Sequence, residues 1–122
     1  MPTANEHLAR VKHNVEFAKS FDWDTTPYLD WVVTAYFYAA VHLVDALLYH
    51  KDKVHGDLHS VRRKYIREKY YLRGIDTQFE SLKDHSEDAR YRLITMTRIR
   101  LESKVIPLYS TILQHIMPQL RS

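Results

Sequence analysis

The sequence lacks cysteine altogether and has only two glycines and four prolines in its 122 residues. The absence of cysteine excludes disulfides, thiolate metal sites and cysteine nucleophiles. The two glycines, Gly56 and Gly74, are too few and too far apart to form a glycine-rich phosphate loop or a dinucleotide-binding fingerprint. A β-sandwich or barrel needs many turns, and turns use glycine, so these architectures are disfavoured as well.

The chain is rich in apolar and aromatic side chains. Hydrophobic residues make up 45% of it, and the aromatics comprise nine tyrosines, four phenylalanines and two tryptophans. This composition argues against disorder. The length suits one domain, because domains cluster near about 100–150 residues. We therefore expect a single compact domain over residues 1–122.

Apolar residues recur at helical spacing in every long segment. The pattern predicts an all-α, up-and-down helical bundle of four to five helices. The first helix is expected over residues 4–20 and the second over 27–50, behind a cap at Thr26. The third is expected from about 57 or 58 to 72, with Leu58 and Val61 in the core and its arginines and lysines facing outward. Asp76 would cap the fourth, and the last would run over 97–120 with a kink at Pro107.

The second helix is apolar on two sides. One stripe contains Val32, Tyr36 and Leu43, and the other contains Phe37 and Val44. A helix of this kind is surrounded, either by its own bundle or by a second subunit. We expect a homodimer, the alternative being that the first, fourth and last helices cover both stripes within one chain.

The longest apolar run, residues 31–48, is nearly long enough to span a bilayer. It contains His42 and Asp45, and charged groups are costly in mid-membrane. A buried helix of a soluble bundle is the better interpretation. The first ten residues lack the pattern of a signal peptide, so we expect a cytoplasmic protein with no membrane partner.

Positive charge is concentrated in the second half of the chain. Residues 60–74 carry six basic side chains and one acidic one, within a formal net charge of +3. A surface of this kind attracts phosphates, as in nucleotides or RNA. The alternative is that these side chains form solvated helix faces.

Two groups of polar residues are candidates for a site. Tyr38, His42, Asp45 and Tyr49 follow one face of the second helix, where they form either a hydrogen-bonded seam that fixes helix register or the lining of a cleft. His59 and Arg62 lie one turn apart near a helix start, where a histidine can move a proton and an arginine can hold an anion.

A metal site is not expected. His55 and His59 are four residues apart, but Gly56 and the expected helix start lie between them, and no glutamate of the metalloprotease pattern accompanies them. No cofactor is indicated either. Arg90 is a further candidate, which either points back toward the second helix as part of a site or pairs with Asp45 or Asp88.

The order of these motifs resembles a known family. The run Ala35–Leu48 with its Tyr38, His42 and Asp45 resembles the long second helix of HEPN domains (higher eukaryotes and prokaryotes nucleotide-binding). The run His55–Arg62 is similar to the family's loop and the histidine that follows it. Residues 86–91 stand where many members carry an arginine and then a small-acidic-tyrosine triplet.

The resemblance implies a helical bundle, often dimeric, whose relatives include endoribonuclease toxins, partners of nucleotidyltransferase antitoxins, and non-catalytic nucleotide- or RNA-associated domains. The ribonuclease members carry an arginine followed, after four to six residues, by a histidine. No arginine here is followed by a histidine at that spacing; at the triplet, Ser86 replaces the arginine and Arg90 the acid.

We therefore expect a domain that binds nucleotide or RNA phosphates, in a toxin–antitoxin or defence setting. The binding residues would be His59, Arg62, Arg63 and Arg90, with Tyr38, His42 and Asp45 as a supporting polar seam. One alternative is a metal-independent endoribonuclease toxin that uses His59 and Arg62 for catalysis. The other is a non-catalytic helical interaction module. The sequence leaves open whether the protein is an enzyme.

Overall fold

The computed structural model describes residues 2–121, and these form helices and loops without a β-strand. The all-α fold class is therefore confirmed. The elements are α1 (Ala4–Lys19), α2 (Leu29–Asp52), α3 (His59–Glu68), the 3₁₀ turn η1 (Tyr70–Leu72), α4 (Asp76–Arg90), α5 (Arg98–Arg100), the π-helical turn η2 (Leu101–Val105) and α6 (Ile106–Leu120).

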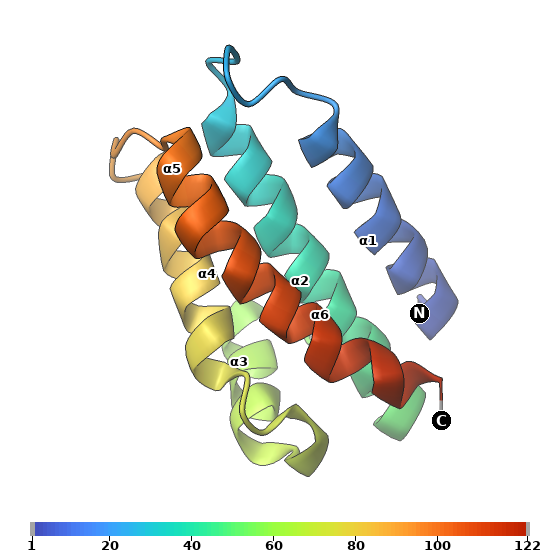
Figure 1. The fold of residues 1–122 in the computed structure, drawn as a ribbon. Coiled ribbons are helices and arrows are strands. Elements are labelled where there is room, and N and C mark those ends of the chain that lie inside the picture. Colours follow the sequence, from blue (N-terminus) through green and yellow to red (C-terminus); the bar gives the residue numbers. More distant parts are fainter. Residues whose placement is uncertain (1, 122) are drawn as a thin grey trace.

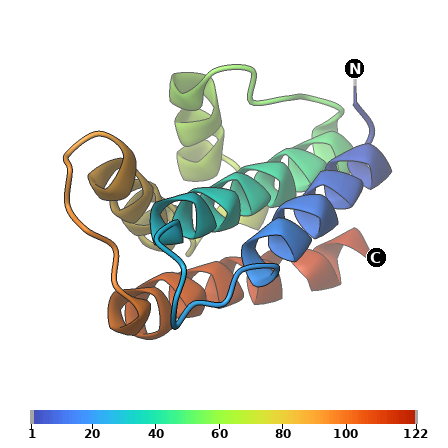
Figure 2. The same ribbon diagram turned by 90° about the horizontal axis from the view of Figure 1, so that it is seen from above.

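The long helices run alternately up and down. In Figure 1, α1 rises on the right, α2 descends, α4 rises on the left, and the last helical run descends across the front of α2. The short helix α3 lies at the lower end between α2 and α4, and Figure 2 shows it on the side of α2 away from α6. Both chain ends lie at the lower end of the bundle in Figure 1.

The centre of the fold is α2, which is buried along most of its length. Its most apolar window is long enough to cross a membrane, and 83% of that window is buried inside the protein. Helices α1, α4 and α6 all pack against it, and Tyr36 of α2 meets Tyr109 of α6 with ring centroids 5.1 Å apart. Both apolar stripes of α2 are thus covered by helices of the same chain. The burial of α2 therefore does not require a second subunit.

Several predicted helix ends differ from the observed ones by one to four residues. The second helix begins at Leu29 rather than Pro27, because Thr26 does not cap it: the Thr26 hydroxyl accepts the N–H of Tyr28 in the turn ahead of the helix. The third helix ends at Glu68, and η1 completes the segment. Leu58 precedes α3 and is 64% exposed, so its prediction as a core residue is wrong.

Pro107 shapes the last helical run. Proline has no N–H to donate to the carbonyl four residues earlier, and its ring crowds that carbonyl. The chain accommodates it by widening the preceding turn: the N–H of Ile106 donates to the carbonyl of Leu101, five residues back, in the π-helical turn η2. Pro107 then lies in the first turn of α6, so the predicted interruption takes the form of a π turn.

Candidate functional site

Arg62 of the predicted site is held in a buried ion pair. It lies in α3 and points inward, with only 6% of its surface exposed. Its Nε and Nη2 atoms donate to the two carboxylate oxygens of Asp45 in α2 at 3.1 and 3.0 Å. Nη2 also donates to the carbonyl of Gly56. The prediction that the α3 arginines all face outward is therefore wrong for Arg62, because a buried carboxylate holds it.

Gly56 is required by this arrangement. A Cβ at this position would lie 2.7 Å from the Cβ of Arg62 and 3.0 Å from both Nε of Arg62 and Oδ1 of Asp45. The first distance is shorter than side chains tolerate, and the other two would require the ion pair to shift, so glycine lets the loop before α3 pass this close to it. The loop, α2 and α3 are thereby fixed to one another at a single point.

His59, the first residue of α3, is exposed and lies beside the ion pair. Its Nδ1 is 3.3 Å from Nη1 of Arg62. Arginine can only donate, so Nδ1 is the acceptor and the proton of the neutral ring is on Nε2. Desolvation lowers the pKa of His59, and the charges of Arg62, Lys83 and Arg90 lower it further. At neutral pH this ring is therefore an uncharged donor through Nε2.

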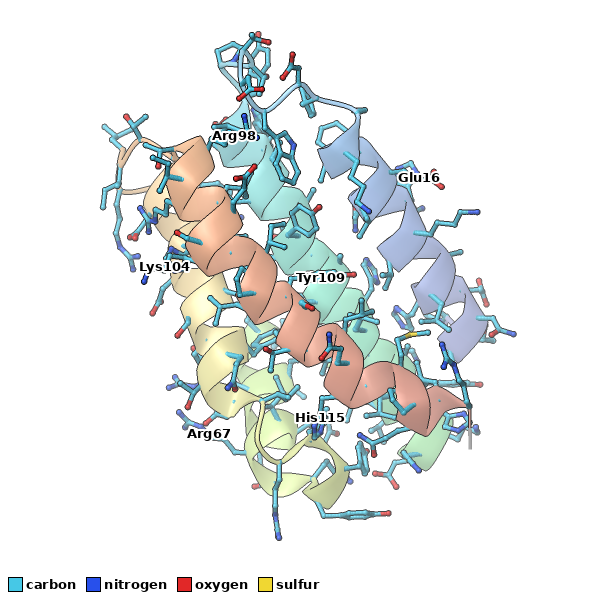
Figure 3. All side chains as sticks on the ribbon, viewed as in Figure 1. Glu16, Arg67, Arg98, Lys104, Tyr109 and His115 are labelled. Carbon is cyan, nitrogen blue, oxygen red and sulfur yellow. The ribbon has the colours of Figure 1, made fainter. Side chains whose placement is uncertain are left out.

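A basic surface adjoins His59 on the outer side of α3 and on α4. It surrounds a shallow depression, in which Glu68 is the carboxylate. Figure 3 labels one of its members, Arg67, at the lower left, on the opposite side of the molecule from Glu16 of α1. We call this the α3 basic surface, and its residues are His59, Ser60, Arg63, Lys64, Arg67 and Lys83.

The cations of the α3 basic surface are only partly neutralised. Arg63 is 3.4 Å from Glu80, Arg67 is 3.6 Å from Asp76, and Lys83 is 3.5 Å from Glu87. All three distances are long for ion pairs, and the arginine side chains are about half exposed. Exposed pairs of this kind contribute little stability, so an incoming phosphate can compete for these cations. Lys64 has no ion pair within residues 2–121.

Arg90 ends α4 and does not pair with either predicted carboxylate. Its guanidinium lies over the rings of Tyr91 and Tyr38, at 4.8 and 5.6 Å from their centroids. It also donates to the hydroxyl of Tyr91 at 3.2 Å. Asp45 is occupied by Arg62, and Asp88 is occupied by Arg92 and Arg100 at 2.7 and 2.6 Å. The predicted pairing of Arg90 with Asp45 or Asp88 is therefore wrong.

Three of the four polar residues of α2 form a seam in which each has a partner on a different element, whereas Tyr49 has ring contacts with His55 and Lys53. Tyr38 meets Arg90 of α4, Asp45 meets Arg62 of α3, and His42 meets His7 of α1. The seam therefore ties the central helix to three neighbours, as the hydrogen-bonded interpretation predicted. Tyr38 and His42 also line surface depressions, as the cleft interpretation predicted.

Three histidines form a row that sequence reasoning did not find. The Nδ1 atoms of His42 and His7 are 3.0 Å apart, and Nε2 of His7 is 3.3 Å from Nδ1 of His55. His7 and His55 are both more than nine-tenths buried. Desolvation lowers the pKa of His7 and of His42 below the ordinary value of 6.5. The only available signal was the position of His7 on the buried stripe of α1 with Val11 and Ala18.

The histidine row has the geometry of a hydrogen-bonded chain. Each neutral imidazole has one N–H, so His7 donates through one nitrogen and accepts through the other. The nitrogens that face each other are separated by single hydrogen-bond distances. Within residues 2–121 no group of three or more histidine, aspartate or glutamate side chains is arranged to hold one metal ion.

Comparison of the chain with protein-family models, with curated proteins and with solved structures finds no match.

Proposed function

We propose that the protein is a HEPN-like domain that binds nucleotides or RNA through their phosphates, at the α3 basic surface. The single observation that carries the proposal is the gathering of Arg63, Lys64, Arg67 and Lys83 around one depression. Arg63, Arg67 and Lys83 have only long ion pairs, of 3.4, 3.6 and 3.5 Å, and Lys64 has none within residues 2–121. Phosphates bind such clusters by displacing counterions and weak intramolecular pairs.

Arg62 supports this site from beneath. Both oxygens of Asp45 are already bound to its guanidinium, so it is not free to hold a phosphate. It donates to His59 instead, and this contact sets which ring nitrogen carries the proton. In the proposal, Arg62 and Asp45 are positioning residues, whereas His59, Arg63 and Arg90 remain available to a ligand.

The endoribonuclease alternative is less well supported by this geometry. A general base must offer a lone pair to the 2′-hydroxyl of RNA. The lone pair of neutral His59 is on Nδ1, which faces Arg62. The ring can donate a hydrogen bond to a phosphate through Nε2, but it has no free acceptor for a proton. Binding without cleavage is the function that this arrangement supports best.

A pair of double variants tests the proposal. Arg63→Ala with Lys64→Ala removes two positive charges from the α3 basic surface. Lys12→Ala with Lys104→Ala removes the same charge elsewhere: Lys12 lies on α1 and is 79% exposed in its side chain, and Figure 3 labels Lys104 on the last helical run. We expect fluorescence anisotropy with a labelled RNA decamer to show weaker binding for the first variant and nearly unchanged binding for the second. Equal losses would contradict a localised site.

The resemblance to HEPN domains extends the proposal to partners. A nucleotidyltransferase antitoxin is the partner that a toxin–antitoxin setting implies, in the cytoplasm, and a second copy of the chain is the other. Co-expression with the product of a neighbouring nucleotidyltransferase gene, followed by co-purification, tests the first. If the two proteins fail to associate, the toxin–antitoxin setting is excluded while phosphate binding is not.

A further inference from the structure

A second surface feature lies on α2, between α1 and the end of α4. Two depressions of about 430 and 390 Å³ open there, and they share Trp31, Thr34 and Tyr38 as lining residues. The first continues to Phe17 and Arg10 of α1, and the second to Arg90 and Tyr91. They therefore form one groove that crosses the face of α2. We call it the aromatic groove.

The groove presents aromatic rings to solvent. Trp31 is 53% exposed, Phe17 45% and Tyr91 71%. Single exposed apolar residues are ordinary, but several flat rings along one groove are typical of a binding surface. Trp31 lies in the first turn of α2 and is a lining residue of both depressions, so its ring is available to a ligand in either one.

Positive charge stands at both ends of the groove. Arg10 lies at the α1 end and Arg90 at the α4 end. Neither has an ion pair within residues 2–121. The lining contains one carboxylate, Asp30. Aromatic rings with arginines beside them match the chemistry of a nucleobase and its flanking phosphates.

The groove lies near the α3 basic surface. Arg90 and Lys83 both act on the charge of His59, and the ring of Phe37 touches those of both Tyr38 and His59. Arg90 is therefore close to both sites, so one strand can contact the groove and the α3 basic surface together.

We propose that the aromatic groove binds an unpaired base of single-stranded nucleic acid, stacked on Trp31, with the adjoining phosphates on Arg10 and Arg90. This inference rests on the proposed phosphate binding and names its substrate class. Duplexes are excluded from the groove, because their bases are already stacked and paired. A two-fold contact between copies would bring four arginines together with only the two Asp30 carboxylates, which disfavours a second copy as the occupant.

The test uses three labelled RNA ligands of equal length: a single strand, a matched duplex and an abasic strand. Binding is followed by anisotropy and by tryptophan fluorescence. We expect the single strand to bind best and to quench the fluorescence. Trp31→Ala should weaken its binding about 5- to 150-fold, which corresponds to the loss of one stacked base. The affinity for the abasic strand should not change.

Two control variants complete the design. Trp31→Phe retains a stacking ring, so it should keep the affinity but lose the quenching. Tyr70→Ala removes an aromatic ring that is 71% exposed and lies outside the groove, so it should bind as the wild type does.

The results distinguish the proposed base binding in the groove from the proposed phosphate binding on α3. Equal affinity for all three RNAs, or normal single-strand binding by Trp31→Ala, would overturn the groove and leave phosphate binding intact. Absence of binding to every RNA at low salt would overturn both. A shift from dimer to monomer in Trp31→Ala, without any change in RNA affinity, would identify a second copy as the occupant.

Discussion

Arg62 and Arg63 are adjacent and identical in type, yet their surroundings give them opposite roles. The Arg62 side chain is 8% exposed and has both Nε and Nη2 on a buried carboxylate, whereas Arg63 is 48% exposed and 3.4 Å from Glu80. Removing one partner of a buried ion pair leaves the other charge uncompensated. Removing one partner of an exposed pair lets water replace it. The two residues therefore make a matched comparison.

Arg62→Ala should lower the free energy of unfolding by about 3–5 kcal/mol, because Asp45 would remain buried without a counter-charge. Arg63→Ala should change it by less than about 1 kcal/mol. Urea denaturation followed by circular dichroism measures both. If Arg62→Ala fails to fold, Arg62→Met combined with Asp45→Leu should be more stable than Arg62→Met alone. Equal stability of the Arg62→Ala and Arg63→Ala variants would contradict the assignment of Arg62 to the core.

Gly56→Ala should also destabilise the protein, by about 1–3 kcal/mol, which is typical of overpacking. The added methyl group would lie 2.7 Å from the Cβ of Arg62. Chemical denaturation of Gly56→Ala, Arg62→Ala and the double variant forms a thermodynamic cycle. We expect the losses in free energy of unfolding from the two single substitutions not to add, because both substitutions act on the same ion pair. Strictly additive losses would mean that Gly56 acts elsewhere.

At the scale of elements, the attachment of α1 depends on the histidine row. His7 connects α1 to His42 of α2 and to His55 of the following loop. Each of these two contacts needs one donor and one acceptor nitrogen. Burial lowers the pKa of His7 and His42 in the folded protein. Protonation therefore favours the unfolded chain, where these residues keep their ordinary pKa near 6.5.

The free energy of unfolding should therefore fall at acidic pH. Above the unfolded pKa of about 6.5, both states carry neutral histidines and the contribution to stability is fully present. Below it, the unfolded chain binds protons that the folded protein does not, so the free energy of unfolding falls. Urea denaturation at pH 7.5 and 5.5 should show this loss in the wild type. In His7→Gln the loss should be smaller, because one of the titrating groups is gone.

The control for this experiment is His13→Gln, which removes an exposed histidine from the same helix. It should retain the full difference between pH 7.5 and 5.5. If His7→Gln and His13→Gln behave alike, then the pH dependence does not come from the histidine row.

The helices themselves were largely predictable, because apolar spacing reports local geometry. The spacing of Val11 and Ala18 predicts α1 to within one residue at its end, and the stripes of α2 predict its burial. Arg62 was not predictable in this way. Its partner Asp45 is seventeen residues earlier on another helix, and a pattern that counts arginine as surface cannot find a buried pair. His7 was obscured for the same reason, since its partners are distant in sequence. For Arg90, the alternative in which it points back toward the second helix agrees with its contacts with Tyr38.

At the scale of the whole molecule, the coverage of α2 removes the first reason for a second subunit. The homodimer stays a prediction, supported only by the resemblance to HEPN domains. Light scattering at micromolar concentration measures it directly. A mass near that of the single chain, 14.6 kDa, would contradict it, and a mass of twice that value would agree.

The proposed RNA binding by the α3 basic surface is the central claim, and its dependence on salt is the most direct test. Each phosphate neutralised on a single strand lowers the logarithm of the binding constant by about 0.7 per logarithmic unit of salt. With Arg63, Lys64, Arg67 and Lys83 engaged, the account predicts a slope of roughly −2 to −3 for an RNA decamer. A folded wild-type protein that shows no binding below about 50 mM salt would contradict the claim. The α3 basic surface would then be a solvated helix face, and the interaction module would replace the RNA-binding domain as the function.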